Sequence, residues 1–174
     1  MIPLSLLLFA APFALLALER KTLRQSTEFL GFSSRKPFLQ LGQGLFLFVF
    51  CLALLIVEGT LLNAAGLLDT EKIVDFILQQ PGWALALAVT VVPLAEETFF
   101  RGYLQKKIGV VLSSAAFAGL HYGYGSIAEI IAAFSVSIVF GQWVRKNNAL
   151  LPVIVAHAAY NAVSIAVALS VSGA

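Results

Sequence analysis

Residues 83–108 have the sequence WALALAVTVVPLAEETFFRGYLQKKI, a long apolar run interrupted by two adjacent glutamates, Glu96 and Glu97, and by Arg101. Ionisable groups at membrane depth cost roughly 2.5–3.5 kcal/mol each on insertion scales. A chain therefore keeps them only where partners neutralise them or where a function uses them.

The composition places the chain among polytopic membrane proteins. Of its 174 residues, 60% are hydrophobic and only 11% are charged, whereas a soluble domain carries about 25% charged residues. The length suits one membrane-embedded domain, residues 1–174, and the sequence shows no internal repeat. The single cysteine, Cys51, excludes an intrachain disulfide and is interpreted as a small core residue.

Hydropathy predicts an all-α fold, a polytopic transmembrane helical bundle with about six spanning helices and one short amphipathic helix. The apolar residues between Ile73 and Leu78 predict the amphipathic helix on the membrane surface. The fourth span is short, and the tight turn after His121 leaves open whether residues 109–121 cross the bilayer fully. The predicted spans are Ile2–Leu18, Phe38–Leu68, Trp83–Ile108, Val110–His121, Ile127–Val144 and Ala149–Val171.

The distribution of basic residues predicts the orientation. Of the eleven Lys and Arg residues, five lie in the connector Glu19–Lys36, two are Lys106 and Lys107, and two are Arg145 and Lys146. If every segment crosses, these places share one side, which the positive-inside rule assigns to the cytoplasm. We therefore expect a multi-pass integral membrane protein with both termini outside. The small size and the lack of appended domains favour a prokaryotic cell membrane as its location.

Three of the predicted helices bring polar side chains to a common depth. Counted from the cytoplasmic helix ends at ~1.5 Å per residue, these side chains lie roughly 10–18 Å deep. The resulting site is expected to open toward the cytoplasmic half of the bilayer. Glu129 lies near the outer end of its span, where no other polar side chains are expected at the same depth, and it is interpreted as peripheral. The set at common depth consists of Glu96, Glu97, His121, His157 and Asn161.

Helical spacing assigns different surroundings to the two adjacent glutamates. Glu97 and Arg101 are four residues apart, so they share a helix face and can pair. Glu96 is rotated by about 100° and is free of that pair. His157 and Asn161 are also four residues apart and present an imidazole and an amide in one direction.

This combination of groups suits the hydrolysis of an acyl or peptide bond. A buried carboxylate beside a histidine can take a proton from water, and a second histidine with an amide can donate to an oxyanion. The sequence contains neither Gly-x-Ser-x-Gly nor His-Glu-x-x-His. Because two histidines and a glutamate form a known zinc set, a divalent metal on Glu96, His121 and His157 and a metal-free site both stay open.

Three motifs together resemble the signature of the CPBP family of intramembrane proteases. This family comprises the type II CAAX prenyl proteases and the bacteriocin-processing proteases, and is also called the abortive-infection family. The resemblance covers roughly residues 83–170, the expected catalytic core, and the motifs follow the family order. They are Glu96-Glu97-x-x-x-Arg101, Phe117-x-x-x-His121 and His157-x-x-x-Asn161.

The resemblance implies an intramembrane endopeptidase that cleaves prenylated C-terminal peptides, leader or bacteriocin peptides, or tails of membrane-anchored proteins. Its expected partners are membrane lipid and such a peptide or protein, and no nucleic acid. The alternative is a non-proteolytic membrane scaffold or regulator of the same fold, in which the polar cluster serves helix packing. The implied roles are water activation by Glu96 and His121, oxyanion stabilisation by His157 and Asn161, and orientation of the site by Glu97 and Arg101.

Overall fold

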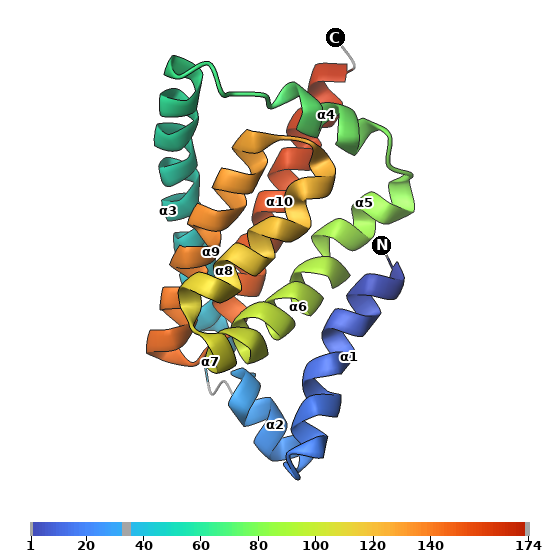
Figure 1. Cartoon of the computed structure of the whole chain (residues 1–174), viewed down its shortest axis with the longest axis vertical. Coiled ribbons are helices and arrows are strands. Elements are labelled where there is room, and N and C mark those ends of the chain that lie inside the picture. Colours follow the sequence, from blue (N-terminus) through green and yellow to red (C-terminus); the bar gives the residue numbers. More distant parts are fainter. Residues whose placement is uncertain (1, 33–35, 173–174) are drawn as a thin grey trace.

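The computed structural model describes residues 2–32 and 36–172, and in this part every regular element is a helix (Figure 1). The predicted all-α class is therefore confirmed. The elements in chain order are α1 (Ile2–Leu18), α2 (Leu23–Leu30), α3 (Pro37–Ala64), α4 (Glu71–Leu78), α5 (Gly82–Val89), α6 (Val91–Glu97), η1 (Thr98–Leu104), α7 (Gln105–Ile108), α8 (Val110–Leu120), η2 (His121–Tyr124), α9 (Ile127–Asn147) and α10 (Leu151–Ser172).

Fewer helices than predicted are long enough to cross a membrane. Within the described ranges, α3, α9 and α10 meet the length and hydropathy required, and a fourth span results if α5 and Val91–Ile108 count as one bent helix. The prediction of about six spans is not confirmed, because α1 has 17 residues and α8 only 11. At 1.5 Å per residue, α8 is about half as long as a ~30 Å hydrocarbon core.

The predicted span Trp83–Ile108 is bent rather than straight. Its two parts meet at Thr90 at an angle of 43°. Pro93, three residues after Thr90, has no N–H to donate, so the backbone bond that would join the two parts is missing. After Glu97 the helix widens into the π-helix η1. π-Helices are rare in proteins, and those that occur are often found at functional sites.

The predicted amphipathic helix is present as α4, which crosses one end of the bundle (Figure 1). Asp69, just before α4, caps the start of α9 with its carboxylate. It accepts hydrogen bonds from Ser126 Oγ at 2.7 Å and from the backbone N–H groups of Ile127 and Ala128 at 3.1 Å each. This cap fixes the α3–α4 connection to the start of α9.

The basic residues meet at the opposite end of the bundle from α4. Lys107 pairs with Glu19 at 2.6 Å. Lys106 donates to the backbone oxygen of Phe29 and, at 2.6 Å, to Asn148 Oδ1. The connector after α1, the end of η1–α7 and the turn between α9 and α10 therefore lie together, at the bottom of Figure 1. The predicted orientation of this end toward the cytoplasm stays a prediction.

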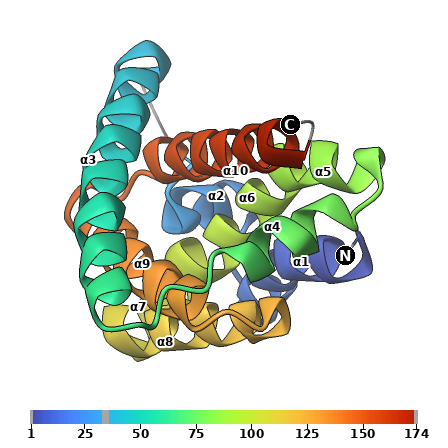
Figure 2. The same ribbon diagram turned by 90° about the horizontal axis from the view of Figure 1, so that it is seen from above.

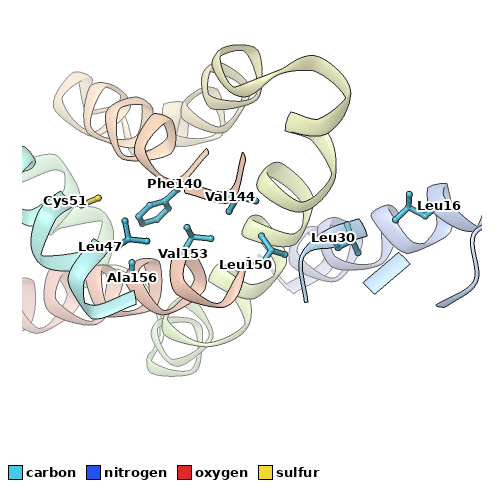
Figure 3. Close-up of a cluster of buried hydrophobic side chains, with 9 residues drawn as sticks. All are labelled: Leu16, Leu30, Leu47, Cys51, Phe140, Val144, Leu150, Val153 and Ala156. Carbon is cyan, nitrogen blue, oxygen red and sulfur yellow. The ribbon is translucent and has the colours of Figure 1, made fainter. Parts of the chain in front are cut away.

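The main apolar core lies where α3, α9 and α10 pack against one another (Figures 2 and 3). Gly44 allows α3 to approach α10 closely, because a Cβ there would lie 2.7 Å from Val155 Cβ and 2.9 Å from the Pro152 oxygen. Cys51 is buried in this core, as expected. The core side chains drawn in Figure 3 are Leu16, Leu30, Leu47, Cys51, Phe140, Val144, Leu150, Val153 and Ala156.

Candidate active site

Glu97 is the centre of a buried charged cluster. Its Oε1 accepts a hydrogen bond from Arg101 Nη1 at 2.9 Å and lies 2.8 Å from His157 Nδ1. The Glu97 and Arg101 side chains are 0% and 1% exposed. The expected pairing of Glu97 with Arg101 is therefore present, and the Arg101 guanidinium also lies over the Phe117 ring, 4.0 Å from its centroid.

A buried hydroxyl connects this cluster to α8. Ser113 Oγ donates to the backbone oxygen of Phe100 in η1 at 2.9 Å, and Phe100 and Phe117 pack edge to face with ring centroids 5.2 Å apart. These contacts position α8 against the π-helix. They therefore determine where His121 lies at the end of α8.

His157 contacts both glutamates of the first motif. Its Nδ1 faces Glu97, and its Nε2 lies 3.9 Å from Glu96 Oε2. Because an ionised carboxylate only accepts hydrogen bonds, Nδ1 carries a hydrogen toward Glu97. Glu96 is 16% exposed, more than its neighbour Glu97. The two adjacent carboxylates thus occupy different surroundings on either side of one imidazole.

His121 is held by its own helix end and by two aromatic rings. Its Nδ1 lies 3.0 Å from the Phe117 oxygen, and its ring packs on Phe117 and Tyr124 at centroid distances of 4.7 and 5.4 Å. Among the described residues, no hydrogen bond or ion pair joins His121 to Glu96. The histidine in contact with Glu96 is therefore His157, whereas the resemblance implied that Glu96 acts together with His121.

Asn161 connects α10 to the broken helix. Its Nδ2 donates to the Ala88 oxygen at 2.8 Å, near the end of α5. An amide nitrogen carries two hydrogens, so one is left for a ligand. The bend at Thr90 and the position of Asn161 are thereby coupled.

A cavity adjoins the cluster, and we call it the central cavity. It offers about 40 Å³ to the centres of water-sized molecules, more than the ~10–15 Å³ that one water needs. Its walls are largely apolar side chains of α3 and α9. The charged, histidine, tyrosine and amide side chains that line it are Arg101, His121, Glu129, His157, Tyr160 and Asn161, and the rings of Phe48, Phe117 and Phe140 line it as well.

Two of these lining residues were missed by the sequence analysis. The interpretation of Glu129 as peripheral is wrong, because Glu129 lines the same cavity as His121 and His157. The short helix η2 returns the chain from His121, so that the start of α9 faces the site. Tyr160 could have been found from the sequence, since it lies three residues after His157 and therefore on the same face of that helix.

Two further cavities, which we call the upper cavities, lie beside α4. One is bounded by α4, α5 and α10, and the other by α3, α4 and α9. Both share Glu129 and Tyr160 with the central cavity. The upper cavities therefore adjoin the central cavity at Glu129 and Tyr160, on the side toward α4. The opening of the site toward the cytoplasmic half stays a prediction.

The candidate metal ligands do not form a ready-made site. Among the described residues, no group of three or more His, Cys, Asp and Glu side chains is arranged to hold a metal ion. His157 directs one ring nitrogen to Glu97, and His121 directs one to a backbone oxygen. The arrangement of Glu96, His121 and His157 therefore does not fit a zinc set without rearrangement.

Comparison with known proteins identifies one family. Residues 78–163 match the family model described as type II CAAX prenyl endopeptidase Rce1-like. The matched segment contains all three motifs and agrees with the resemblance inferred from them. No curated protein and no solved structure matches the chain significantly.

Proposed function

We propose that this chain, whose residues 78–163 match the type II CAAX prenyl endopeptidase Rce1-like family model, is an intramembrane endopeptidase whose catalytic residues are Glu96, His121, His157 and Asn161. The observation that carries this proposal is the position of His157. It joins the buried Glu97–Arg101 pair to Glu96, beside a cavity with room for water.

In this mechanism Glu96 acts as the general base. A water molecule held near His121 loses a proton to Glu96, and its oxygen attacks the carbonyl carbon of the substrate peptide. The negative charge that forms on the carbonyl oxygen is stabilised by hydrogen-bond donors. Glu96 then gives the proton to the leaving amine as the C–N bond breaks, which yields a carboxylic acid and an amine.

The oxyanion donors are His157 and Asn161. His157 lies between Glu96 and Glu97, and an imidazolium in that position carries hydrogens on both nitrogens. The Nε2–H of His157 and the second amide hydrogen of Asn161 are then two hydrogen-bond donors for the oxyanion, and they come from residues one helical turn apart. Glu97 and Arg101 act as orienting residues, since they fix the imidazole through Nδ1.

The substrates that suit a site among apolar helices are peptides anchored in the membrane. Candidates are prenylated C-terminal peptides, leader or bacteriocin peptides, and the tails of membrane-anchored proteins. We propose a prokaryotic cell membrane as the location, with the basic end in the cytoplasm.

The test uses the purified full-length chain in lipid vesicles with one synthetic peptide of each substrate class, and mass spectrometry detects the products. We expect Glu96→Gln and His121→Ala to lower the cleavage rate by about 10²–10⁴-fold. Glu58→Gln serves as a matched control, because Glu58 lies on α3 and lines only an upper cavity. Unchanged cleavage by Glu96→Gln would refute the mechanism.

The same assay separates the protease from the alternative, a scaffold or regulator of the same fold. A scaffold hydrolyses none of the peptides, and its Glu96→Gln variant loses stability or partner binding instead. Cleavage in the presence and absence of a strong chelator then decides between a metal-dependent and a glutamate-dependent reaction.

A further inference from the structure

Glu129 lies at the junction of the central cavity and both upper cavities. It is on α9, three residues after the Ser126 cap, and Tyr160 faces it from α10. Glu129 and Tyr160 are the two residues common to the linings of all three cavities. A substrate group that lies beside Glu129 therefore adjoins all three cavities.

The Glu129 carboxylate makes no hydrogen bond or ion pair in the described part of the chain, whereas Arg101, His157 and Asn161 each have one hydrogen-bond partner. Arg101 and His157 are engaged by Glu97, and Asn161 donates to the Ala88 oxygen. No hydrogen bond or ion pair within the described ranges reaches the carboxylate of Glu129. Since an unpaired carboxylate in apolar surroundings is costly, this group is suited to a partner that arrives from outside.

The charges around the central cavity favour a cation as that partner. Arg101 is balanced by its ion pair with Glu97. Glu129 is then the one carboxylate among the residues that line this cavity, and no Lys or Arg in the described part of the chain pairs with it. Tyr160 and Tyr124 line the adjoining space, and tyrosine rings also attract cations.

The position of Glu129 relates this cation to the reaction. Glu129 shares the central cavity with His157, and Tyr160 is one helical turn from His157. A group bound at Glu129 therefore lies close to the bond that the catalytic residues attack. A peptide can supply an ammonium or guanidinium group there from a Lys or Arg side chain, or from a free N-terminus.

We propose that Glu129 is a specificity-determining residue that binds a basic group of the peptide substrate next to the scissile bond. This inference rests on the proposed endopeptidase function. The enzyme is therefore expected to prefer substrates with a positive charge near the cleaved bond.

The first experiment measures cleavage with the full-length chain in lipid vesicles. The probes are membrane-anchored peptides with a blocked N-terminus, in which a single Lys is moved along an otherwise uncharged sequence. At the position where Lys gives the fastest cleavage, Lys is then replaced by Arg and by Glu. A further peptide has a free N-terminus and no Lys, so that a cation from the N-terminus is distinguished from one on a side chain. We expect Lys or Arg at one position to raise kcat/KM by about 10–100-fold over Ala.

Variants test whether Glu129 causes this preference. Glu129→Gln should abolish the preference for Lys, and Glu129→Asp should retain part of it. Glu58→Gln, the matched control in an upper cavity, should retain it fully. The proposal is overturned if no basic group is preferred at any position, or if the preference persists in Glu129→Gln.

Binding of the same peptides to Glu96→Gln protein in nanodiscs separates this inference from the proposed function. If no peptide is hydrolysed but Lys peptides bind about 10–100-fold more tightly in a Glu129-dependent manner, the endopeptidase proposal alone fails. If peptides are hydrolysed and bound without a charge preference, the Glu129 proposal alone fails.

Discussion

Replacing each of the two adjacent glutamates by glutamine should have opposite consequences. Glu97 is fully buried and accepts from both Arg101 and His157. Glu97→Gln leaves the Arg101 guanidinium buried without a counter-charge, and removal of one partner of a buried ion pair costs about 3–5 kcal/mol. Glu96 is more exposed, and within the described ranges its one ion-pair contact is with His157, at 3.9 Å. Glu96→Gln should change the unfolding free energy by less than about 1 kcal/mol and abolish cleavage.

The measurement is equilibrium unfolding in mixed micelles with increasing denaturing detergent, followed by the fluorescence of Trp83 and Trp143. The double variant Glu97→Gln/Arg101→Met is the control, since replacing both partners of a buried pair by neutral groups is often close to neutral. It should be more stable than Glu97→Gln alone. Equal destabilisation by Glu96→Gln and Glu97→Gln would refute the assignment of different roles to the two carboxylates.

Two further predictions concern helix packing and the cap of α9. Gly44→Ala should lower the unfolding free energy by about 1–3 kcal/mol, because its Cβ would overlap Val155. In the same unfolding titration the control Gly42→Ala should be neutral or stabilising, because a Cβ at Gly42 has no neighbour within 4 Å. Equal effects of the two substitutions would contradict the close approach of α3 and α10. Hydrogen bonds from Ser126 and from the start of α9 hold the pKa of Asp69 below its usual range. The stability that Asp69 provides is therefore present above pH ~4 and lost as the pH falls further. Unfolding titrations between pH 7 and pH 3 should show this loss in the wild type and less of it in Asp69→Asn, and identical pH dependence would contradict it.

The local parts of the site could be predicted from the sequence. The pairs Glu97–Arg101 and Phe117–His121 follow from helical spacing, which brings residues four apart onto one face regardless of the remaining fold. The meeting of basic residues at one end follows from the alternation of apolar and basic segments. The two pairs depend on short-range helix geometry, and the meeting of the basic residues depends on the order of apolar and basic segments along the chain.

The long-range parts could not be predicted. The contact of His157 with both glutamates depends on the rotation of α10 relative to a helix 60 residues earlier, and hydropathy does not specify that rotation. The prediction of about six spans is not confirmed, because an apolar count does not register where a helix bends, as at Thr90, or where it ends early, as α8 does. Glu129 was missed for a related reason, since its depth was counted along a full span rather than from the turn after His121.

The distribution of unpaired polar atoms favours a functional site over a packing role for the charged cluster. In the described part of the chain five buried side-chain nitrogen and oxygen atoms lack a hydrogen-bond partner, and three of them are Glu97 Oε2, Arg101 Nε and Arg101 Nη2. A cluster that serves only helix packing gains most when its members satisfy one another, because each buried unpaired group costs about 1–3 kcal/mol. Here the unpaired atoms concentrate where Arg101 lines a cavity with room for water. Such an arrangement lowers stability at one place and leaves hydrogen-bonding capacity for a ligand, which is the trade-off expected of a catalytic centre.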